Sequence, residues 1–391
     1  MVLTVVGVDG SPLPPGAAAA LAEAEVVAGA RRHLDAAALP PGVERCELGS
    51  VAEVLDRLDG RRAVILASGD PGFFGIVRLL RAGGRVPLVY PAVSSVARAF
   101  ARIGRPWDDV AVVSAHGRSL APAVNVCRAR AATAVLTAPG AGPAEIGAAL
   151  HGWERTLVVA EDLDGPHERV TTLSAADAAA RTWREPNVLL CLRDADAVPA
   201  LGWVAGGAGR PDGWALPDGA FEHRAGMVTK SEVRALALAR LAPGPGTLVW
   251  DVGAGSGSVA VECARLGAAV LAVERRPDDA QRVRDNAAAH DVEVRVVEGE
   301  APAALAGLPP PDAVFVGGGG PDVVAAAART GAARVVVALA ALDRLAPTRE
   351  ALRGYRVEGV QVAASRLAEL PDGTVRLAAT NPILLLWGLQ E

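Results

Sequence analysis

The sequence predicts an α/β protein with parallel sheets, divided into two domains. Short apolar runs rich in β-branched residues recur along the chain, and Ala/Leu-rich stretches of helical length separate them. The 391 residues exceed one ordinary domain, and a Gly- and Pro-rich stretch at 202–219 interrupts the pattern. We therefore expect strands that are buried on both faces under helices.

The predicted strands fall on both sides of that interruption. In the first half they are 3–8, 63–68, 87–90, 110–114, 133–137, 156–160 and 187–192. In the second half they are 247–253, 269–274, 292–299, 313–318, 334–340, 357–364 and 381–388. We accordingly predict a first domain at 1–205, a linker at 206–220 and a second domain at 221–391.

Composition and charge narrow the class of protein. The net charge is −5 without a basic run, which argues against nucleic-acid binding. No window of about 20 apolar residues exists, so we expect no membrane-spanning helix, and the N-terminus lacks the basic region of a signal peptide. The histidines show no metal-ligand spacing, so no metal site is predicted. We expect reduced thiols in a cytoplasmic protein at Cys46, Cys127, Cys191 and Cys263.

The segment "GMVTKSEVRALALARL", residues 226–241, follows the interruption and is predicted to form a helix. It contains Lys230, the single lysine of the chain. Thr229 and Glu232 have the spacing of a capping box, in which the two side chains satisfy N–H groups at the helix start. Apolar residues then share one helical face at positions 233, 236, 237 and 241.

The most informative stretch is "LVWDVGAGSGSVAVECARL". A strand runs into the loop Gly253-Ala254-Gly255-Ser256-Gly257 and then into a helix, and such glycines let the backbone approach a ligand closely. Asp251 precedes the loop, and Glu274 closes the next strand, where an acid accepts hydrogen bonds from ribose hydroxyls. Ser258 stands where the dinucleotide fingerprint has its third glycine, which favours S-adenosylmethionine over NAD. A cap on the following turn at Asp251 and a solvated strand end at Glu274 are the alternatives.

The first half shows a different pattern at its strand ends. Ser68-Gly69-Asp70-Pro71 follows one strand, and Ser94-Ser95 follows another. Small residues and one carboxylate at strand ends predict a polar notch. A simple tight turn at Gly69-Asp70-Pro71 is the alternative, as is an ordinary loop or core role for His116.

Longer phrases in both halves resemble a known pair of enzyme families. The first half resembles the tetrapyrrole methylases of cobalamin biosynthesis, through "VVGVDG", "ASGDPGFFG", "PAVSSVARAFARIGRPWDD" and "SAHGR". The second half resembles that pathway's C-15-methylating, decarboxylating domain, through "ALPDGAFEHRAGMVTKSEVRALALARL", "WDVGAGSGSVAVE", "EGEAP", "PDAVFVGGGG" and "NPILLLWG". The fusion in this order resembles the precorrin-6Y C5,15-methyltransferase (decarboxylating) family over nearly the whole chain.

The resemblance implies a two-lobed tetrapyrrole methylase domain followed by a Rossmann-like methyltransferase domain. It implies two S-adenosylmethionine sites, one in each domain, and a precorrin tetrapyrrole as substrate. The first domain would methylate C-5. The second would methylate C-15 and remove the carboxyl of the C-12 acetate, giving precorrin-8. A metal-free and a cobalt-containing substrate both remain open, and we expect a homo-oligomer, either a dimer or a tetramer.

The resemblance also implies site residues. Donor contacts in the first domain would be Gly7, Val8, Asp9, Gly69, Asp70, Pro71, Ser94 and Ser95. In the second they would be Thr229, the loop 253–257, Glu274 and Ala301, joined by Asp251 from its place before the loop. Cationic anchors for substrate carboxylates would be Arg102, Arg118, Lys230 and Arg234, with an ordinary surface charge as the alternative for each. No catalytic acid or base is predicted.

Two other classes of protein remain as alternatives. Asp9 departs from the glycine-rich first loop that is usual in the family. It leaves room for a donor-sensing or scaffold protein, or for a chain in which only one methyltransferase domain is active. An NAD-linked reductase would rest on the glycine loop alone.

Overall fold

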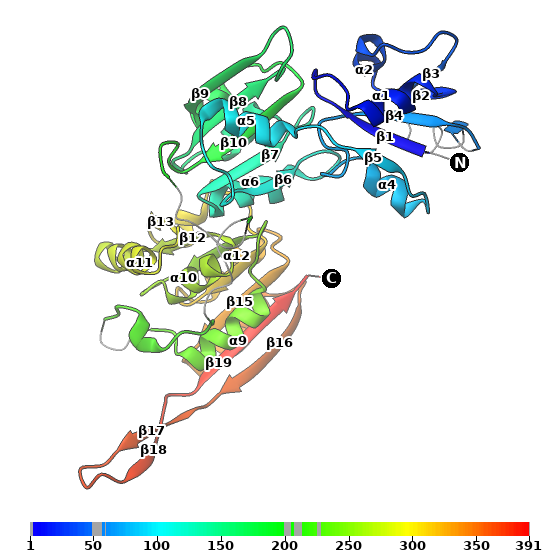
Figure 1. The fold of residues 1–391 in the computed structure, drawn as a ribbon. Helices are drawn as coiled ribbons and strands as arrows, with labels where there is room; N and C mark the ends of the chain where they lie inside the picture. The colour runs from blue at the N-terminus through cyan, green and yellow to red at the C-terminus, as the bar shows by residue number, and fades with distance from the viewer. Residues whose placement is uncertain are drawn as a thin grey trace.

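The computed structural model describes residues 3–48, 57–58, 60–198, 205–206, 213–224 and 228–390. Within them the chain forms three larger sheets, which follow one another along the molecule, and a two-stranded hairpin (Figure 1). Helices pack against the sheets, so the predicted α/β class is confirmed. In the same residues no helix combines the length and the apolar character needed to cross a bilayer. The four cysteines are free and buried, as expected.

The first sheet is parallel throughout, with the order β3-β2-β4-β1-β5. Val5 and Val6 point to opposite faces, and each is fully buried in its own apolar cluster. Since the strands run the same way, the carboxyl ends of β1, β4 and β5 lie together at one edge. The elements are β1 (Leu3–Val8), α1 (Pro15–Ala22), β2 (Val26–Gly29), α2 (Arg31–Ala36), β3 (Glu44–Glu47), β4 (Ala63–Ser68), α4 (Ile76–Ala82) and β5 (Leu88–Tyr90).

The second sheet is mixed, so the prediction of parallel sheets throughout is wrong here. Its order is β6-β7-β10-β8-β9, and only β6 and β7 run parallel. An apolar run such as 187–192 indicates that both faces of the strand are buried. It does not indicate the direction of the strand, because parallel and antiparallel strands can both be buried in this way. The elements are α5 (Ser95–Ile103), β6 (Ala111–Ser114), α6 (Leu120–Ala129), β7 (Ala132–Leu136), α7 (Pro143–Ala149), β8 (Thr156–Glu161), β9 (Arg169–Ser174), α8 (Ala175–Ala179) and β10 (Asn187–Leu192).

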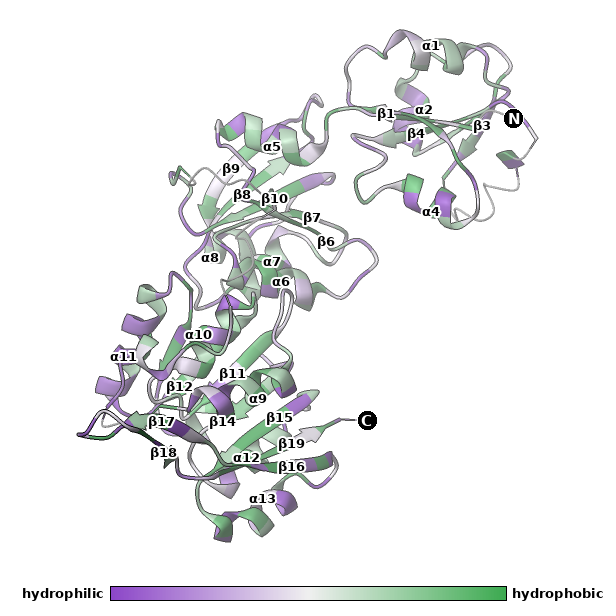
Figure 2. Ribbon diagram, turned by 60° about the horizontal axis from the view of Figure 1, so that its bottom comes forward, coloured by the Kyte–Doolittle hydropathy of each residue, from purple (hydrophilic) through white to green (hydrophobic). Residues whose placement is uncertain are grey.

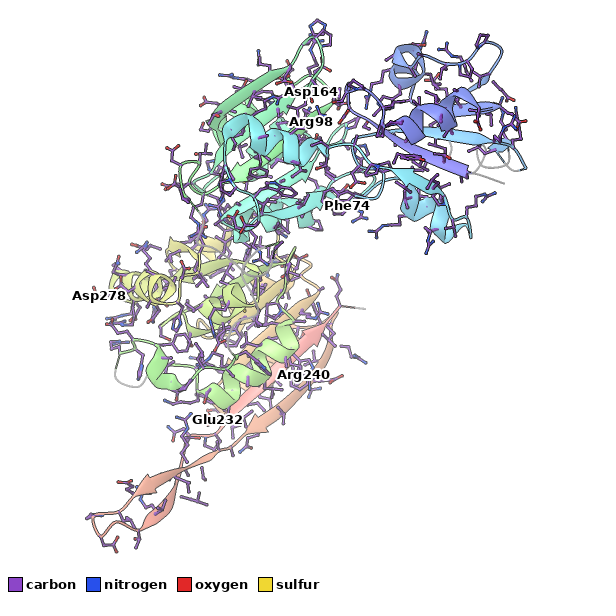
Figure 3. The ribbon with its side chains drawn as sticks, in the orientation of Figure 1. Phe74, Arg98, Asp164, Glu232, Arg240 and Asp278 are labelled. Carbon is purple, nitrogen blue, oxygen red and sulfur yellow. The ribbon has the colours of Figure 1, made fainter. Side chains whose placement is uncertain are left out.

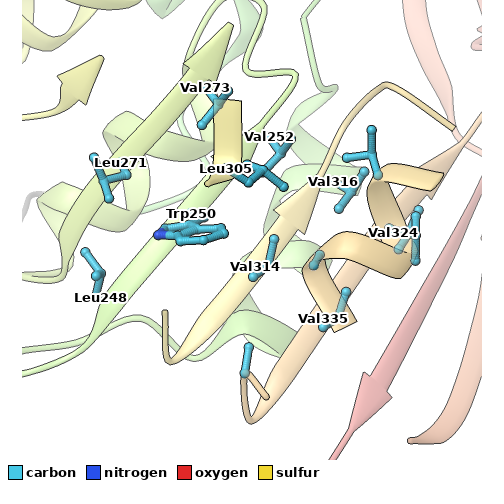
Figure 4. Packing of buried hydrophobic residues seen from close by; sticks show 14 of the residues in the cluster. Leu248, Trp250, Val252, Leu271, Val273, Leu305, Val314, Val316, Val324 and Val335 are labelled. Carbon is cyan, nitrogen blue, oxygen red and sulfur yellow. The ribbon is translucent and has the colours of Figure 1, made fainter. Parts of the chain in front are cut away.

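The third sheet has the order β13-β12-β11-β14-β15-β19-β16. Its first five strands are parallel, and β19 runs antiparallel to both of its neighbours. After β11 the chain adds β12 and β13 on one side of that strand, and then β14 and β15 on its other side. The carboxyl end of β11 is therefore the switch point at which such sheets bind ligands. Trp250 and neighbouring Val and Leu side chains form the core on one face (Figure 4), and these strands are predominantly hydrophobic in Figure 2.

The strands of this sheet are β11 (Leu248–Val252), β12 (Ala269–Glu274), β13 (Arg295–Glu298), β14 (Ala313–Val316), β15 (Arg334–Leu339), β16 (Arg356–Val362) and β19 (Ile383–Leu389). Its helices are α9 (Ser231–Leu241), α10 (Ser258–Arg265), α11 (Pro277–Ala289), α12 (Pro321–Ala328) and α13 (Leu345–Ala351). Short 3-10 turns lie at η1 (Asp218–Ala220), η2 (Ala303–Leu305) and η3 (Leu342–Arg344).

A hairpin of β17 (Ser365–Glu369) and β18 (Val375–Ala379) connects β16 to β19 and extends away from the sheet (Figure 1). Leu367 and Leu377 lie opposite each other in its register, and their side chains are 78% and 67% exposed. At its base Arg366 contacts Glu232 of α9 and Asp218 of η1. The hairpin is therefore anchored at its base and presents apolar side chains to solvent midway along its strands.

The second and third sheets meet through a polar and aromatic contact surface, called the dock below. The buried Arg155 donates two hydrogen bonds to Glu293, at 3.0 and 2.8 Å. Trp153, which precedes β8, joins the apolar core of the third sheet. Its ring lies between the guanidinium groups of Arg128 and Arg295, at 4.3 and 4.6 Å from the ring centre. A buried aromatic anchor beside a buried ion pair resembles the centre of a specific interface.

The predicted strands are all present, with ends displaced by three residues at most. The sequence patterns missed β2, β3, β9, β17 and β18. Residues 207–212 of the predicted linker lie outside the described residues. Gly206 of that linker donates a hydrogen bond to the carbonyl of Asp108 in the first domain. Leu216 and Ala220 instead pack on the third sheet's helices, where they adjoin the apolar cluster around Phe221.

We predict that Trp153→Ala uncouples the two domains. Removing a buried Trp side chain costs about 3–5 kcal/mol, and here the loss falls at the contact that joins two cores. Calorimetry should show a lower first melting temperature and separate transitions. Trp214→Ala, at a 54% exposed position, is the matched control. Indistinguishable melting of the two variants would contradict the dock.

Candidate functional site

The loop between β11 and α10 forms a cradle of three glycines. Gly253, Gly255 and Gly257 have φ values of +73°, +56° and +72°, which favour glycine. A Cβ at position 253 would lie 2.9 Å from the Gly318 backbone nitrogen, and one at 257 would lie 2.8 Å from Val283. At 255 a Cβ would meet nothing within 4 Å. The outer glycines are therefore needed for packing, and the middle one leaves open space above the loop.

Glu274 is fixed beside this cradle. It ends β12 and is only 7% exposed, so the alternative of a solvated strand end is wrong. One carboxylate oxygen accepts a hydrogen bond from Gly255 N–H at 3.0 Å, and the other accepts from Arg276 N–H at 3.0 Å. The acid thus ties the loop to the next strand and keeps a negative charge at the switch point.

Asp251 lies beneath the loop rather than in it. Its carboxylate is buried and accepts a hydrogen bond from Ala260 N–H in the first turn of α10 at 2.9 Å. Its other oxygen has no hydrogen-bond partner among the described residues. Burial, reinforced by the nearby charge of Glu274, raises the pKa of Asp251 to about 7 against the opposing effect of the Ala260 hydrogen bond. The carboxylate thus holds the first turn of α10, beyond the turn that directly follows β11.

The remaining residues predicted for this site lie around the same edge. Ser256 is buried, and its carbonyl accepts a hydrogen bond from Asn286 at 2.8 Å. Ala254 and Ala301 adjoin the apolar clusters on the two faces of the sheet. Ala301 follows β13, whose last residue Glu298 pairs in register with Glu274.

The start of α9 differs from the predicted capping box. The helix begins at Ser231, its N-cap is Lys230, and no side chain of the N-cap residue caps it. Asp218 instead accepts from Ser231 N–H at 2.9 Å, and Glu232 binds Arg366. The capping-box prediction is wrong because a carboxylate distant in sequence takes that place. Met227 and Gly226 lie outside the described residues.

Two of the predicted cationic anchors near this edge have protein partners. The Nζ atom of Lys230 lies 3.6 Å from Oδ2 of Asp218. Arg234 is fully buried, contacts Glu262 and the carbonyl oxygens of Leu216 and Thr229, and stacks over Phe221. The guanidinium of Arg234 is therefore committed to holding residues 216–221 and Thr229 in place. It is no surface charge, and nothing in its contacts supports a substrate anchor.

The first domain brings its three predicted motifs together at one edge of the first sheet. Gly69 N–H donates to Val8 O at 2.9 Å, and Ala92 N–H donates to Gly69 O at 3.3 Å. A Cβ at Gly7 would lie 2.2 Å from Gly69 O, so only glycine allows this approach of the loops. The turn after Gly69 and the start of α5 complete the edge.

The polar side chains of these motifs hold the loops in shape. Asp70 accepts a hydrogen bond from Gly72 N–H at 2.8 Å, as in the tight turn that was the alternative there, and Pro71 is buried. Ser94 is the N-cap of α5 and accepts from Ala97 N–H at 3.2 Å. Ser95 is the first residue of that helix.

Asp9 belongs to an ion cluster that joins the first two sheets. Its carboxylate accepts from the N–H groups of Ser11 and Val93 and pairs with Arg98 of α5. Burial alone would raise the pKa of Asp9, but these two hydrogen bonds and the Arg98 charge outweigh it and lower that pKa. Arg98 also pairs with Asp164 in the loop after β8 (Figure 3).

Arg102 extends the same cluster. Its guanidinium forms ion pairs with two carboxylates: Nη2 lies 2.7 Å from Asp164 Oδ1, and Nε lies 2.6 Å from Glu168 Oε1. Arg98 and Asp164 were not among the residues predicted from the sequence. The spacing of four between Arg98 and Arg102 on a helix was the available signal for Arg98. Arg118 and His116 are exposed in the loop after β6.

Comparison with known proteins identifies the class. A family model described as tetrapyrrole (corrin/porphyrin) methylases matches residues 3–179. A second, described as a precorrin methyltransferase domain, matches residues 219–374. The glycine-loop edges of the first and third sheets thus fall in two methyltransferase domains on one chain. These matches exclude an NAD-linked reductase.

Relatives that span both halves narrow the family. A Sinorhizobium sp protein named precorrin-6Y C(5,15)-methyltransferase [decarboxylating] is 42% identical over 332 residues, covering 81% of this chain and 78% of that protein. The chain therefore belongs to the precorrin-6Y C(5,15)-methyltransferase (decarboxylating) family. A probable cobalt-precorrin-6B C(15)-methyltransferase (decarboxylating) of Pyrobaculum calidifontis is 37% identical over 44% of this chain and 93% of its own. A crystal structure of a Geobacter metallireducens precorrin-6Y C5,15-methyltransferase aligns with 46% of this chain and 97% of its own, at 30% identity and a TM-score of 0.42.

We predict that Asp251→Asn flattens part of the pH dependence of stability. The folded pKa of about 7 lies above the ordinary value of 3.8, so the folded state binds the extra proton. The contribution of Asp251 to wild-type stability should therefore fall as pH rises from about 4 to 7 and stay level above 7. At about 1.4 kcal/mol per pKa unit, the variant should gain a few kcal/mol relative to wild type over that range.

Denaturant unfolding at pH 4.5, 6 and 8 measures this difference. Asn retains the oxygen that accepts from Ala260, so the cap is preserved. Asp322→Asn, at an exposed position in α12, is the matched control. A variant-to-wild-type difference that does not change with pH would show that Asp251 ionises normally.

Proposed function

We propose that this chain methylates C-5 and C-15 of precorrin-6Y and removes the C-12 acetate carboxyl as carbon dioxide, giving precorrin-8. The observation that carries the proposal is the 42% identity over 332 residues to a protein named for both methylations. We assign the C-5 reaction to the first domain and the C-15 reaction with decarboxylation to the second. We also propose that residues 216–220 belong with the second domain, because Leu216 and Ala220 pack on its helices.

The second domain fits S-adenosylmethionine. The loop 253–257 is open above Gly255, and the fixed carboxylate of Glu274 stands beside it to accept hydrogen bonds from ribose hydroxyls. Thr229 and Ala301 lie near the same edge. When bound, the cofactor supplies a methyl group on a positively charged sulfur. Asp251 supports this cradle from below through Ala260.

The first domain fits a second molecule of the same cofactor. Its three loops meet at one sheet edge, where Gly7 and Gly69 leave the backbone without side chains. Asp9 is engaged by Ser11, Val93 and Arg98, so its departure from the family pattern builds a contact between the lobes. We therefore propose two donor sites rather than one active and one silent domain.

Both reactions require chiefly positioning and exclusion of water. The macrocycle carbons are nucleophilic, so the chain must hold carbon and methyl in line, which contributes about 7–11 kcal/mol in well-oriented cases. Loss of carbon dioxide leaves an electron pair that the conjugated macrocycle accepts, and a dry pocket favours the loss of the carboxylate charge. Arg118, exposed in the loop after β6, and Lys230, which also pairs with Asp218, are the proposed anchors for substrate carboxylates. Arg102 and Arg234 make several contacts within the protein.

The test is incubation of the full chain with precorrin-6Y and donor labelled in the methyl group. Two methyl groups per macrocycle and one carbon dioxide are expected. A cobalt-containing substrate is the second candidate, since the Pyrobaculum relative is named for one. Running both substrates in parallel decides between them, and transfer to neither would refute the proposal.

Single-site variants should separate the two reactions. Gly7→Ala places a Cβ against Gly69 O and should abolish the first donor site; Glu274→Gln removes the charge at the second. Titration calorimetry with S-adenosylhomocysteine should show two sites in wild type and one in each variant. Glu274→Gln should lose carbon dioxide release even when it is given the macrocycle already methylated at C-5, and Gly7→Ala should retain carbon dioxide release with that substrate. Loss of both sites in either variant would contradict separate sites.

We further propose that the chain is a cytoplasmic homo-oligomer. Free, buried cysteines support the location. The exposed leucines of the β17–β18 hairpin support self-association, because an isolated hairpin with apolar side chains in water is unfavourable unless covered. A second copy of the same hairpin offers a matching apolar face.

Replacing Leu367 by Ser should shift the chain to a smaller species. Light scattering coupled to gel filtration measures the mass directly. Leu79→Ser, at a 52% exposed position in α4 of the first domain, is the control and should leave the mass unchanged. Equal mass for wild type and Leu367→Ser would rule out the hairpin as the contact.

A further inference from the structure

The first domain docks on the amino-terminal edge of the third sheet. Gly246, whose carbonyl accepts from Asn125 at 3.1 Å, lies just before β11. Glu293, the partner of Arg155, lies just before β13, and Asp312, which Asn125 also contacts, lies just before β14. Because these strands are parallel, all three residues mark the same edge.

The second donor site lies at the opposite edge. The loop 253–257 follows β11, and Glu274 ends β12. β11 is five residues long, so about 17 Å of sheet separates the cradle from the dock at a strand rise of about 3.4 Å per residue. The mouth of this site therefore faces away from the first domain.

The first donor site lies beyond the far end of the second sheet. β8 starts beside Arg155 of the dock, and the loop after its end carries Asp164. Asp164 pairs with Arg98, which pairs with Asp9 of the first donor loop. β8 has six residues and spans about 20 Å. Figure 1 shows the second sheet between the other two, so two strand lengths of packed protein separate the donor sites.

The dock is built to stay closed. The Arg155 side chain is 0% exposed, and besides Glu293 it donates to the carbonyls of Cys127, Glu154 and Arg128. Opening the dock would leave a desolvated charge without its partner and would pull Trp153 out of an apolar core. A swing of one domain toward the other site would have to break these contacts.

Contacts between copies would not shorten the route. The hairpin β17–β18 follows β16 and precedes β19, whose first residues pair with the end of β15. It therefore projects from the edge that carries the second donor site. Association of two hairpins brings second sites near second sites, and leaves each first site remote.

We propose that the singly processed tetrapyrrole leaves the protein after one reaction and reaches the other site from solution. The inference rests on the proposed function and holds for either order of the two reactions. Each site must then recognise the free macrocycle by itself. The singly processed compound should also accumulate before final product appears.

Mixing the two single-site variants tests the inference. Gly7→Ala and Glu274→Gln chains, each at the wild-type concentration, are given precorrin-6Y and labelled donor together. Free release predicts final product at the wild-type rate, with the same lag and the same transient amount of the one-methyl compound. A lag present in the mixture and absent in wild type would show direct transfer within a chain and overturn the proposal.

Two further variants distinguish release into solution from transfer between associated copies and from transfer that depends on the dock. The same comparison in a Leu367→Ser background should give the same rates; a slower mixture there would show transfer between associated copies and overturn release into solution. Trp153→Ala should leave the lag unchanged at temperatures where both domains are folded. Failure of the wild-type chain to methylate precorrin-6Y would instead refute the proposed function, whatever the mixture does.

Discussion

In a parallel sheet every loop that follows a strand emerges at the same edge, and both candidate sites depend on that constraint. In the first sheet it brings the ends of β1, β4 and β5 close enough that Gly7 and Gly69 must be glycine. In the third it sets Glu274 beside the loop that follows β11. The same constraint leaves the opposite edge of the third sheet free of site loops, and there the first domain docks.

Buried charges hold the assembly together at three places, and each is compensated differently. Arg155 satisfies its guanidinium with Glu293 and backbone carbonyls. Arg234 does so with Glu262 and an aromatic face. The Asp9 cluster pairs that one carboxylate of the first lobe with arginines and carboxylates of the second. Because burying a charge is costly unless it is paired, these clusters specify geometry more than they add stability.

The sequence predicted strand positions well because apolar β-branched runs report burial directly. It did not predict direction in the second sheet, since 187–192 is as apolar as any parallel strand. It missed β17 and β18, which alternate with charged residues in an exposed hairpin. For the site, the glycine loop and Glu274 are local patterns and were found. Asp218 as a cap and Arg234 as a buried cation depend on partners distant in sequence, which no local pattern reveals.

Asp218 has a consequence for how such a two-domain chain can be assembled or divided. Its carboxylate contacts Ser231 at the start of α9 and Arg366 at the base of the hairpin. A stretch that reads as spacer is thus an integral strap of the second fold. A gene split placed after residue 220 would deprive the second product of that strap, so a viable split, or a natural fusion point, has to lie upstream of Leu216.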